Sequence, residues 1–436
     1  MELYKYTYNY THDNKTVDFT QAQLNDFDEM NYIIGSESNI SENIINEIAL
    51  ISNENTEIDQ FIQSLQFIAE QSKLSDACIY LFENDVHQIL YSRIKESTKF
   101  SNPFIITLFL IIMNNILTLT NKLLPILMSE FQQILYNIVN RYSCGPPQVV
   151  HIIFDTFLVL MKPNTHISLF LYYIQFFKVY LKVPNPCIDP DLTKKSFQCC
   201  NRMFEIPHDG LLKCMLENDF VYDCCIHMNR KTPSFFEACQ LMGNIANLNR
   251  YLIDHLPDDF FTELMSDLLE DPDDKIVSAA LKVCQSFTSI VTLRELLIDE
   301  KPIFTKILKC GERNFNVKQC SIELLTALME SKSTNLEKNI EEYGTLDFFV
   351  DYIETGDVEM IGHVLSALQY LICHFIENYL SKSKIPNCQP PFVSVLLNSS
   401  TLYQSITDLR FSTDTNYDTI QEATYIVYDL FSKYVK

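Results

Sequence analysis

Apolar positions recur along this chain with a period of about 42 residues. The recurrence is found by counting from six residues: Pro146, Asp189, Lys231, Asp273, Asn314 and Asp357. Positions eight, eleven and fourteen after each start are all apolar: Phe154, Phe197, Cys239, Leu281, Ile322 and Leu365; Phe157, Cys200, Met242, Cys284, Leu325 and Leu368; and Leu160, Met203, Ile245, Phe287, Leu328 and Leu371. Because steps of three residues follow one face of an α-helix, the pattern predicts six helices that bury equivalent faces.

A polar row accompanies the apolar face in every repeat. Row nine, the residues nine positions after each start, consists of Asp155, Gln198, Gln240, Lys282, Glu323 and Ser366. A unit with one buried and one polar face cannot bury itself alone and must stack on its neighbours. Amphipathic segments between the predicted helices, such as DDFFTELMSDLLED at residues 258–271, are expected to form outer helices.

The two ends of the chain depart from this pattern. Residues 1–45 are polar without a clear period and are expected to be a partly ordered N-terminal segment, with the repeat solenoid at 46–436. Residues 381–392 contain three prolines and are expected to be a loop insertion, because proline interrupts a helix. Residues 393–436 are then expected to form a capping repeat. The apolar segment that begins at Pro103 has Asn114 at a core position.

Composition supports an all-α fold and disfavours several ligands. The chain of 436 residues contains only 8 glycines, which suits long helices better than glycine-rich turns. Its net charge of −23 repels phosphate backbones and anionic lipid surfaces, so neither nucleic acid nor membrane is an expected partner. The longest apolar run, residues 103–113, is shorter than the roughly 20 residues that span a bilayer.

The first residues lack the basic and apolar regions of a secretory signal. We therefore expect a cytoplasmic or nuclear protein. The 14 cysteines are then interpreted as reduced thiols that behave as small core residues.

Recognised catalytic motifs are missing from the sequence. The glycine spacing excludes the Gly-rich phosphate-binding motifs and G-x-S-x-G, and no histidine begins H-E-x-x-H. Cys224 and His227 are three residues apart on one predicted helical face, but zinc sites commonly use C-x-x-C pairs, which this chain lacks. Buried thiols are the preferred interpretation, so no metal or other cofactor is expected.

Two segments and the period together resemble the armadillo repeat family. The segments are DPDDKIVSAALKVCQSFTS at residues 271–289 and FFEACQLMGNIA at 235–246, and the likeness covers roughly residues 57–436. HEAT repeats are the close alternative. The resemblance implies a right-handed superhelix of three-helix units, whose third helices line a concave groove for extended peptides or partner segments.

Within that family, GNIA is similar to the signature of nuclear-import adaptors, which implies that Asn244 would contact the backbone of a ligand. The other units have Val159, Arg202, Ser286, Ala327 and Tyr370 at the equivalent position. Gln240 stands where the signature has tryptophan, and the chain contains none. The alternative role for Asn244 is a side chain at a helix end that bonds a neighbouring loop.

Together these patterns predict a monomeric, non-enzymatic scaffold or adaptor that presents a groove to a peptide or partner protein. The groove candidates are Asp155, Gln198, Gln240, Asn244, Lys282, Ser286, Glu323, Ser366 and Tyr370. A second candidate surface is an acidic patch that consists of Asp258, Asp259, Glu263, Asp267 and Glu270. It would either dock a basic segment of a partner or be the solvated face of an outer helix. The alternatives are a chaperone nucleotide-exchange-type cofactor, a divergent nuclear-transport adaptor or an enzyme.

Overall fold

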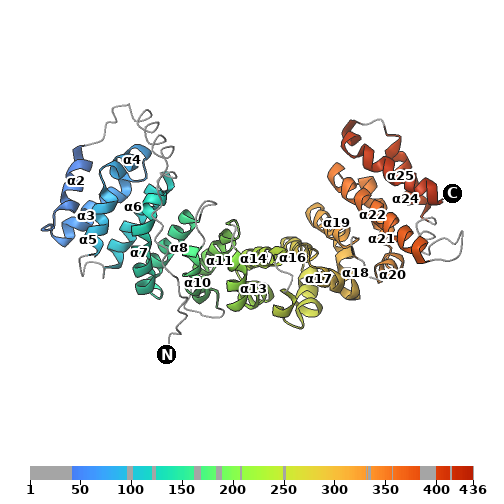
Figure 1. Cartoon of the computed structure of the whole chain (residues 1–436), viewed down its shortest axis with the longest axis horizontal. Helices are drawn as coiled ribbons and strands as arrows, with labels where there is room; N and C mark the ends of the chain where they lie inside the picture. Colours follow the sequence, from blue (N-terminus) through green and yellow to red (C-terminus); the bar gives the residue numbers. More distant parts are fainter. Residues whose placement is uncertain are drawn as a thin grey trace. The chain divides into compact units, whose positions relative to one another are not determined.

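The computed structural model consists of α-helices and short 3-10 and π segments, without a strand in its described residues (Figure 1). Those residues are 42–95, 102–119, 124–161, 168–182, 189–206, 209–248, 252–329, 331, 335–355, 357–382, 399–412 and 415–435. The prediction of an all-α fold is confirmed. Most of the predicted N-terminal segment, residues 1–41, and most of the predicted loop at 381–392 lie outside the described residues. The chain divides into two compact units, Met1–Leu124 and Pro125–Lys436.

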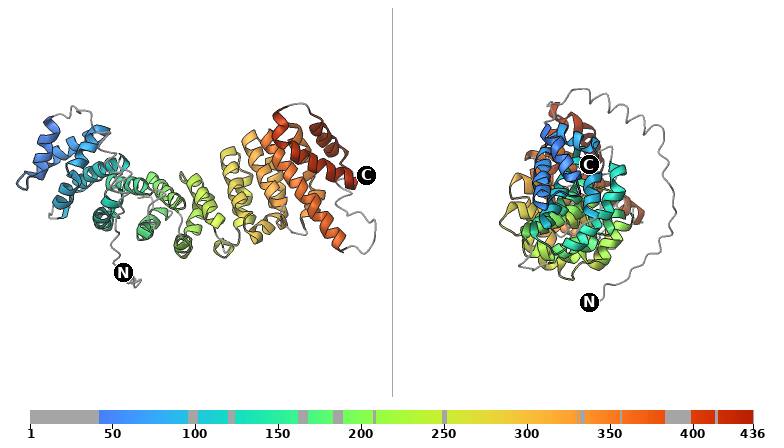
Figure 2. Two further views of the ribbon diagram at one scale, coloured as in Figure 1. Left: turned by 45° about the horizontal axis from the view of Figure 1, so that its top comes forward. Right: turned by 90° about the vertical axis from the view of Figure 1, so that its left-hand side faces the viewer.

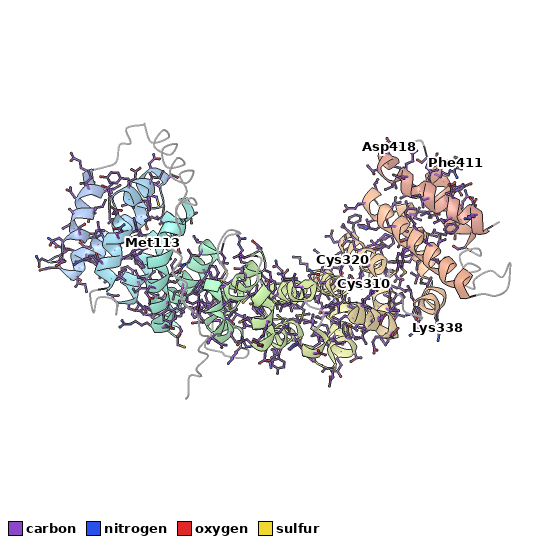
Figure 3. The ribbon with its side chains drawn as sticks, viewed as in Figure 1. Met113, Cys310, Cys320, Lys338, Phe411 and Asp418 are labelled. Atoms are coloured by element: carbon purple, nitrogen blue, oxygen red, sulfur yellow. The ribbon has the colours of Figure 1, made fainter. Side chains whose placement is uncertain are left out.

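The first unit is built around two helices that pack on each other, α3 and α6. Its helices are α2 (Glu42–Ser52), α3 (Ile58–Gln71), α4 (Ser75–Glu83), α5 (Val86–Lys95) and α6 (Pro103–Leu119). Most of the apolar run of α6 is buried in this unit, Met113 (labelled in Figure 3) included, although Phe104 is 44% exposed. Asn114 is also buried, which agrees with its place at a core position.

The second unit contains a row of stacked helices, which we call the inner helices (Figures 1 and 2). Each packs against the next in chain order: α8 (Pro147–Leu160), α11 (Pro190–Met203), α14 (Phe235–Leu248), α16 (Asp274–Phe287), α19 (Phe315–Met329), α22 (Val358–Lys382) and α25 (Gln421–Val435). The first six are the helices that the period predicts. All eighteen predicted core residues are buried.

The outer elements of the second unit precede the inner helix that each supports. They are α7 (Leu124–Tyr142), α9 (Ser168–Leu171), α10 (Ile174–Leu181), α12 (Asp209–Glu217), α13 (Phe220–Asn229), η3 (Leu252–His255), η4 (Phe260–Met265), α15 (Ser266–Leu269), α17 (Val291–Asp299), α18 (Lys301–Cys310), α20 (Asn335–Glu342), α21 (Thr345–Thr355), α24 (Ser400–Arg410) and η5 (Thr415–Ile420). A complete unit therefore has three helices, as in α17, α18 and α19.

At four of the six counting starts, the side chain of the start residue caps the N-terminus of an inner helix. Asp189 and Asp273 accept hydrogen bonds from the backbone N–H two residues later, at 3.0 and 2.9 Å. Asn314 and Asp357 accept from the N–H three residues later, at 3.0 and 2.9 Å. Each bond satisfies an N–H that has no partner inside its own helix. The period therefore marks where inner helices begin.

Small residues seven positions after four of the six starts let the inner helix approach the outer helix that precedes it; the other two starts have Ile153 and Val364 there. The Ser196 hydroxyl donates to the Phe177 carbonyl of α10 at 2.9 Å, and the Ser321 hydroxyl donates to the Ile307 carbonyl of α18 at 2.7 Å. Both serines are buried, so these bonds remove the cost of an unpaired hydroxyl. Ala238 and Ala280 fill the same position in two other units and are also fully buried.

One outer segment differs from its expected form. Residues 258–271 do not make a single regular helix: a π-helix, η4, is followed by the one-turn helix α15. The wider π turn allows adjacent Phe260 and Phe261 both to be buried, and each packs edge-on against Phe287 of α16. The wider turn thus buries more aromatic surface than one stripe of a regular helix would.

In the part of the chain that the structure describes, no helix is both long enough and apolar enough to cross a bilayer.

Truncation of one core residue tests the stacking. We expect Leu281→Ala, at a fully buried position of α16, to lower the free energy of unfolding by about 2–5 kcal/mol, because it removes packed methyl groups and leaves a cavity. Urea denaturation followed by circular dichroism measures the change. The control is Lys275→Ala, an exposed position on the same helix, which should change stability by less than about 0.5 kcal/mol. Equal effects of the two substitutions would contradict the packing.

Candidate protein-binding groove

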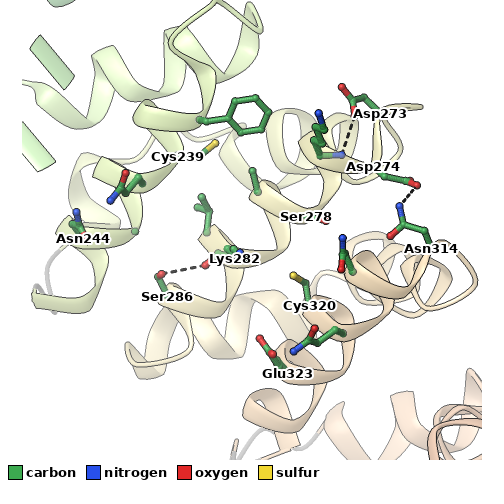
Figure 4. A pocket seen from close by; sticks show the side chains of 18 of the residues that line it. Cys239, Asn244, Asp273, Asp274, Ser278, Lys282, Ser286, Asn314, Cys320 and Glu323 are labelled. Carbon is green, nitrogen blue, oxygen red and sulfur yellow. Dashed lines mark hydrogen bonds between the residues drawn. The ribbon is translucent and has the colours of Figure 1, made fainter. Parts of the chain in front are cut away.

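A cavity of about 1020 Å³ runs across three successive inner helices, α14, α16 and α19 (Figure 4). We call it the groove. Five of the nine predicted groove candidates line it: Gln240, Asn244, Lys282, Ser286 and Glu323. They come from helices that are about 42 residues apart in the sequence, so the repeat itself brings them together.

The groove is hollow because small residues occupy the helix surfaces that face it. Gly243, Ser278, Ala279 and Ser286 all line the cavity. A Cβ atom at Gly243 would lie 3.0 Å from the Ser286 Oγ atom, closer than an ordinary contact. Glycine at this position therefore permits the close approach of α14 and α16 at the floor of the groove.

The polar lining includes six carboxamide side chains: Gln240, Asn244, Asn247, Asn314, Asn316 and Gln319. Asn314 caps α19 and also bonds to Asp274. Gln240, Asn247, Asn316 and Gln319 have no side-chain hydrogen bond within the described residues. Each such amide offers both donors and an acceptor, the two groups that an extended backbone also carries.

Asn244 is held by a neighbouring inner helix. Its Nδ2 donates to the Oδ1 atom of Asn201 on α11 at 3.0 Å. The buried Asn201 in turn donates from its own Nδ2 to the Glu237 carbonyl at 3.0 Å. The partner of Asn244 is therefore a side chain on the adjacent repeat, and the bond fixes which way the amide faces the groove.

Lys282 and Glu323 are charged groove residues without an ion pair within the described part of the chain. Two carboxylates on the inner helices are compensated across repeats, whereas Lys275 of the groove lining has no ion pair among the described residues either. Asp155 pairs with Lys195 at 2.5 Å, and Asp274 pairs with Arg313 at 2.8 Å. Lys282 is exposed and Glu323 is half-buried, so both remain accessible to a ligand.

The remaining groove candidates lie on other inner helices and do not line this cavity. Asp155 on α8 is engaged by Lys195, and Gln198 on α11 is half-buried. On α22, the Ser366 hydroxyl donates to the Gly362 carbonyl at 2.9 Å, and Tyr370 is half-buried. Their role in binding stays a prediction.

The structure also adds groove residues that the sequence interpretation missed. Phe236 and Gln319 lie four positions before Gln240 and Glu323, and both line the cavity. Residues four apart lie on the same face of a helix, so the polar row at position nine could have been extended by one turn to find them. Phe236 is 48% exposed, which gives the groove an aromatic wall.

The candidate acidic patch lies apart from the groove lining. All five of its carboxylates are exposed, on and beside η4 and α15. Glu270 pairs with Lys306 of α18 at 3.0 Å. The other four have no ion pair within the described residues.

Cys224 and His227 are both buried, and the bonds of the histidine explain its role. The Nε2–H of His227 donates to the Leu181 carbonyl at 2.9 Å, because a carbonyl can only accept a hydrogen bond. The Nδ1 atom of His227 then accepts from the Thr232 hydroxyl at 2.8 Å. Burial lowers the pKa of His227 and raises that of the Cys224 thiol. No group of three potential metal ligands is found in the part of the chain described.

In comparisons with known proteins, only solved structures match this chain, and the likeness concerns the fold. No family model and no curated protein matches the sequence. An engineered protein is similar over 89% of this chain and 99% of its own, with a TM-score of 0.58 and 13% identity. A designed armadillo repeat protein matches 58% of this chain and 98% of its own, with a TM-score of 0.46 and 12% identity. Another, in complex with the peptide (KR)4, matches 58% and 98%, with a TM-score of 0.46 and 14% identity.

The stacked units and the groove define this chain as an all-α helical-repeat protein. Its repeat is armadillo-like, because a short first helix and a second outer helix precede the inner one, as in α17 (9 residues), α18 (10 residues) and α19 (15 residues). The predicted armadillo-type fold is confirmed.

Acidification tests the buried histidine. Because burial holds the pKa of His227 below its ordinary value, the unfolded chain binds a proton at a higher pH than the folded chain does. Stability should therefore fall as pH is lowered from about 7 to about 5, and His227→Gln should reduce that loss. The midpoints of urea denaturation at the two pH values measure this loss of stability. The exposed His363→Gln serves as the control, and an unchanged pH dependence in His227→Gln would contradict the assignment.

Removal of charge tests the acidic patch. We expect replacement of Asp258, Asp259, Glu263 and Asp267 by serine to leave partner capture unchanged at low ionic strength, because solvated surface carboxylates contribute little on their own. Affinity isolation followed by mass spectrometry measures this. Loss of a partner from this variant alone would instead identify the patch as a docking surface for a basic segment.

Proposed function

We propose that this protein is a non-enzymatic scaffold that binds an extended segment of a partner protein in the groove formed by α14, α16 and α19. The observation that carries the proposal is a cavity of about 1020 Å³ whose amide and charged side chains are largely without partners among the described residues. A surface of this kind leaves hydrogen-bonding groups available to a ligand, while the stacked helices hold them at fixed positions.

The proposed mechanism is preorganisation. The inner helices are held by fully buried faces, so the groove side chains are already placed before a partner arrives. An extended segment presents N–H and C=O groups along its length, and the carboxamides of Gln240, Asn316 and Gln319 can satisfy both kinds. Binding then costs mainly the ordering of the partner segment.

Features of the groove favour binding over catalysis. Its two thiols, Cys239 and Cys320, have pKa values raised by burial, so both are protonated and poor nucleophiles near neutral pH. Among the described residues, no histidine lines the cavity. Armadillo-like repeats typically serve as non-enzymatic scaffolds, which supports the same interpretation.

The charge of the chain favours a protein partner. A net charge of −23 opposes association with nucleic acid and anionic lipid. We place the protein in the cytoplasm or nucleus, where its reduced thiols would persist.

Substitution of the groove tests the proposal. We expect a Gln240→Ala, Lys282→Ala, Glu323→Ala variant to lose partners that the wild-type chain captures, with affinity reduced by at least about tenfold, because three accessible polar groups are removed from three adjacent helices. Affinity isolation with quantitative mass spectrometry measures the loss. Circular dichroism should show unchanged helix content.

The matched control is Lys213→Ala, Glu217→Ala. These residues form a pair on the outer helix α12, with side chains 70% and 63% exposed, and their removal deletes one positive and one negative charge, as the groove variant does. Partners should be retained. Identical partner sets for the wild-type chain and the groove variant would refute the groove as the binding surface.

A further inference from the structure

One ion pair shows how row nine of an inner helix lies against the inner helix of the next repeat. Asp155, in row nine of α8, pairs with Lys195, which lies six positions after the start of the next repeat, on α11. The corresponding position six on α19 is Cys320, and it should therefore face Lys282, in row nine of α16. The register of the stack thus predicts which residue each row-nine side chain meets on the following helix.

In this register the residue opposite Lys282 is a cysteine, Cys320, whereas the residue opposite Asp155 is a lysine. Burial raises the pKa of the Cys320 thiol, while the positive charge of Lys282 acts to lower it and the negative charge of Glu323 acts to raise it. Figure 4 shows all three side chains on the adjacent helices α16 and α19. Cys320 is buried and its pKa is raised overall by burial, so it stays uncharged and compensates neither neighbour.

Glu323 is likewise uncompensated. The residue at position six of the next repeat is His363, which is exposed and lies outside ion-pairing distance of Glu323. Lys282 and Glu323 are themselves more than the ion-pairing distance of 4.0 Å apart, since no salt bridge joins them. Of the other charged residues in the lining, Asp273 caps α16, Asp274 is paired with Arg313, and Lys275 lies two helical turns before Lys282. Lys282 and Glu323 are thus two opposite charges without an ion pair that face the groove from successive helices.

We propose that the groove selects an extended protein segment that carries one acidic and one basic side chain, the acidic one opposite Lys282 and the basic one opposite Glu323. This inference rests on the proposed function and names the class of its partner. Adjacent packed helices lie about 8–10 Å apart, and an extended chain advances about 3.3 Å per residue. The two ligand charges should thus be about two or three positions apart in the segment.

Like charges along the ligand are disfavoured by the same arrangement. A segment with two basic residues would place one against Lys282, and a segment with two acidic residues would place one against Glu323. Opposite charges across an interface contribute to selection mainly by excluding mismatched partners. Lys282 and Glu323 therefore set both the charge composition of the bound segment and the direction in which the segment lies in the groove.

A display selection tests the inference with random dodecapeptides as the probe. The library is selected on the full chain and counter-selected on the Gln240→Ala, Lys282→Ala, Glu323→Ala variant, so that only groove-dependent peptides remain. We expect them to share an acidic and a basic residue at constant spacing and in constant order. The charge-exchanged variant Lys282→Glu, Glu323→Lys should select the same spacing in the opposite order.

A binding measurement on one selected peptide completes the test. Replacing its acidic residue by lysine should weaken binding to the wild-type chain by about three- to tenfold, and Lys282→Glu should reverse that preference. Groove-dependent peptides without an acid–base pair, or an unchanged order in the charge-exchanged variant, would overturn the inference while leaving the proposed function intact. Recovery of no groove-dependent peptide would overturn both.

Discussion

Burial of one repeated helical face is the constraint on which the second unit depends. Six inner helices, α8 to α22, present apolar side chains at positions eight, eleven and fourteen, and the packing of neighbouring helices buries all of them. Because this face is buried, the opposite polar face must line a common surface, and the groove is a consequence of the packing. Serine or alanine at position seven in four repeats, buried beside the outer helix, sets how closely the two layers approach.

The inner helices could be predicted from the sequence because their signal is repeated. Leu281 alone indicates little, but equivalent residues in six segments indicate a shared environment, and all eighteen are buried. The π-helix at Phe260–Met265 could not be predicted in this way, because its geometry depends on packing of Phe260 and Phe261 against Phe287. Tertiary contacts of this kind override a local periodic pattern.

The groove was only partly predictable for a similar reason. Row nine led to Gln240, Lys282 and Glu323, because polarity repeats there. It could not show that Asp155 is neutralised by Lys195 while Lys282 is not, since this depends on which residue the next repeat places opposite. Nor could the sequence show the bond between Asn244 and Asn201, which joins two repeats through their side chains.

The order of the inner helices has a consequence for when the groove is formed. α14, α16 and α19 each have a packed inner helix on both sides, whereas α25 has one on a single side among the described elements. In a linear array, opening spreads inward from the least supported helices. Because each of these three helices is supported on both sides, the recognition surface would persist until a neighbouring repeat had opened.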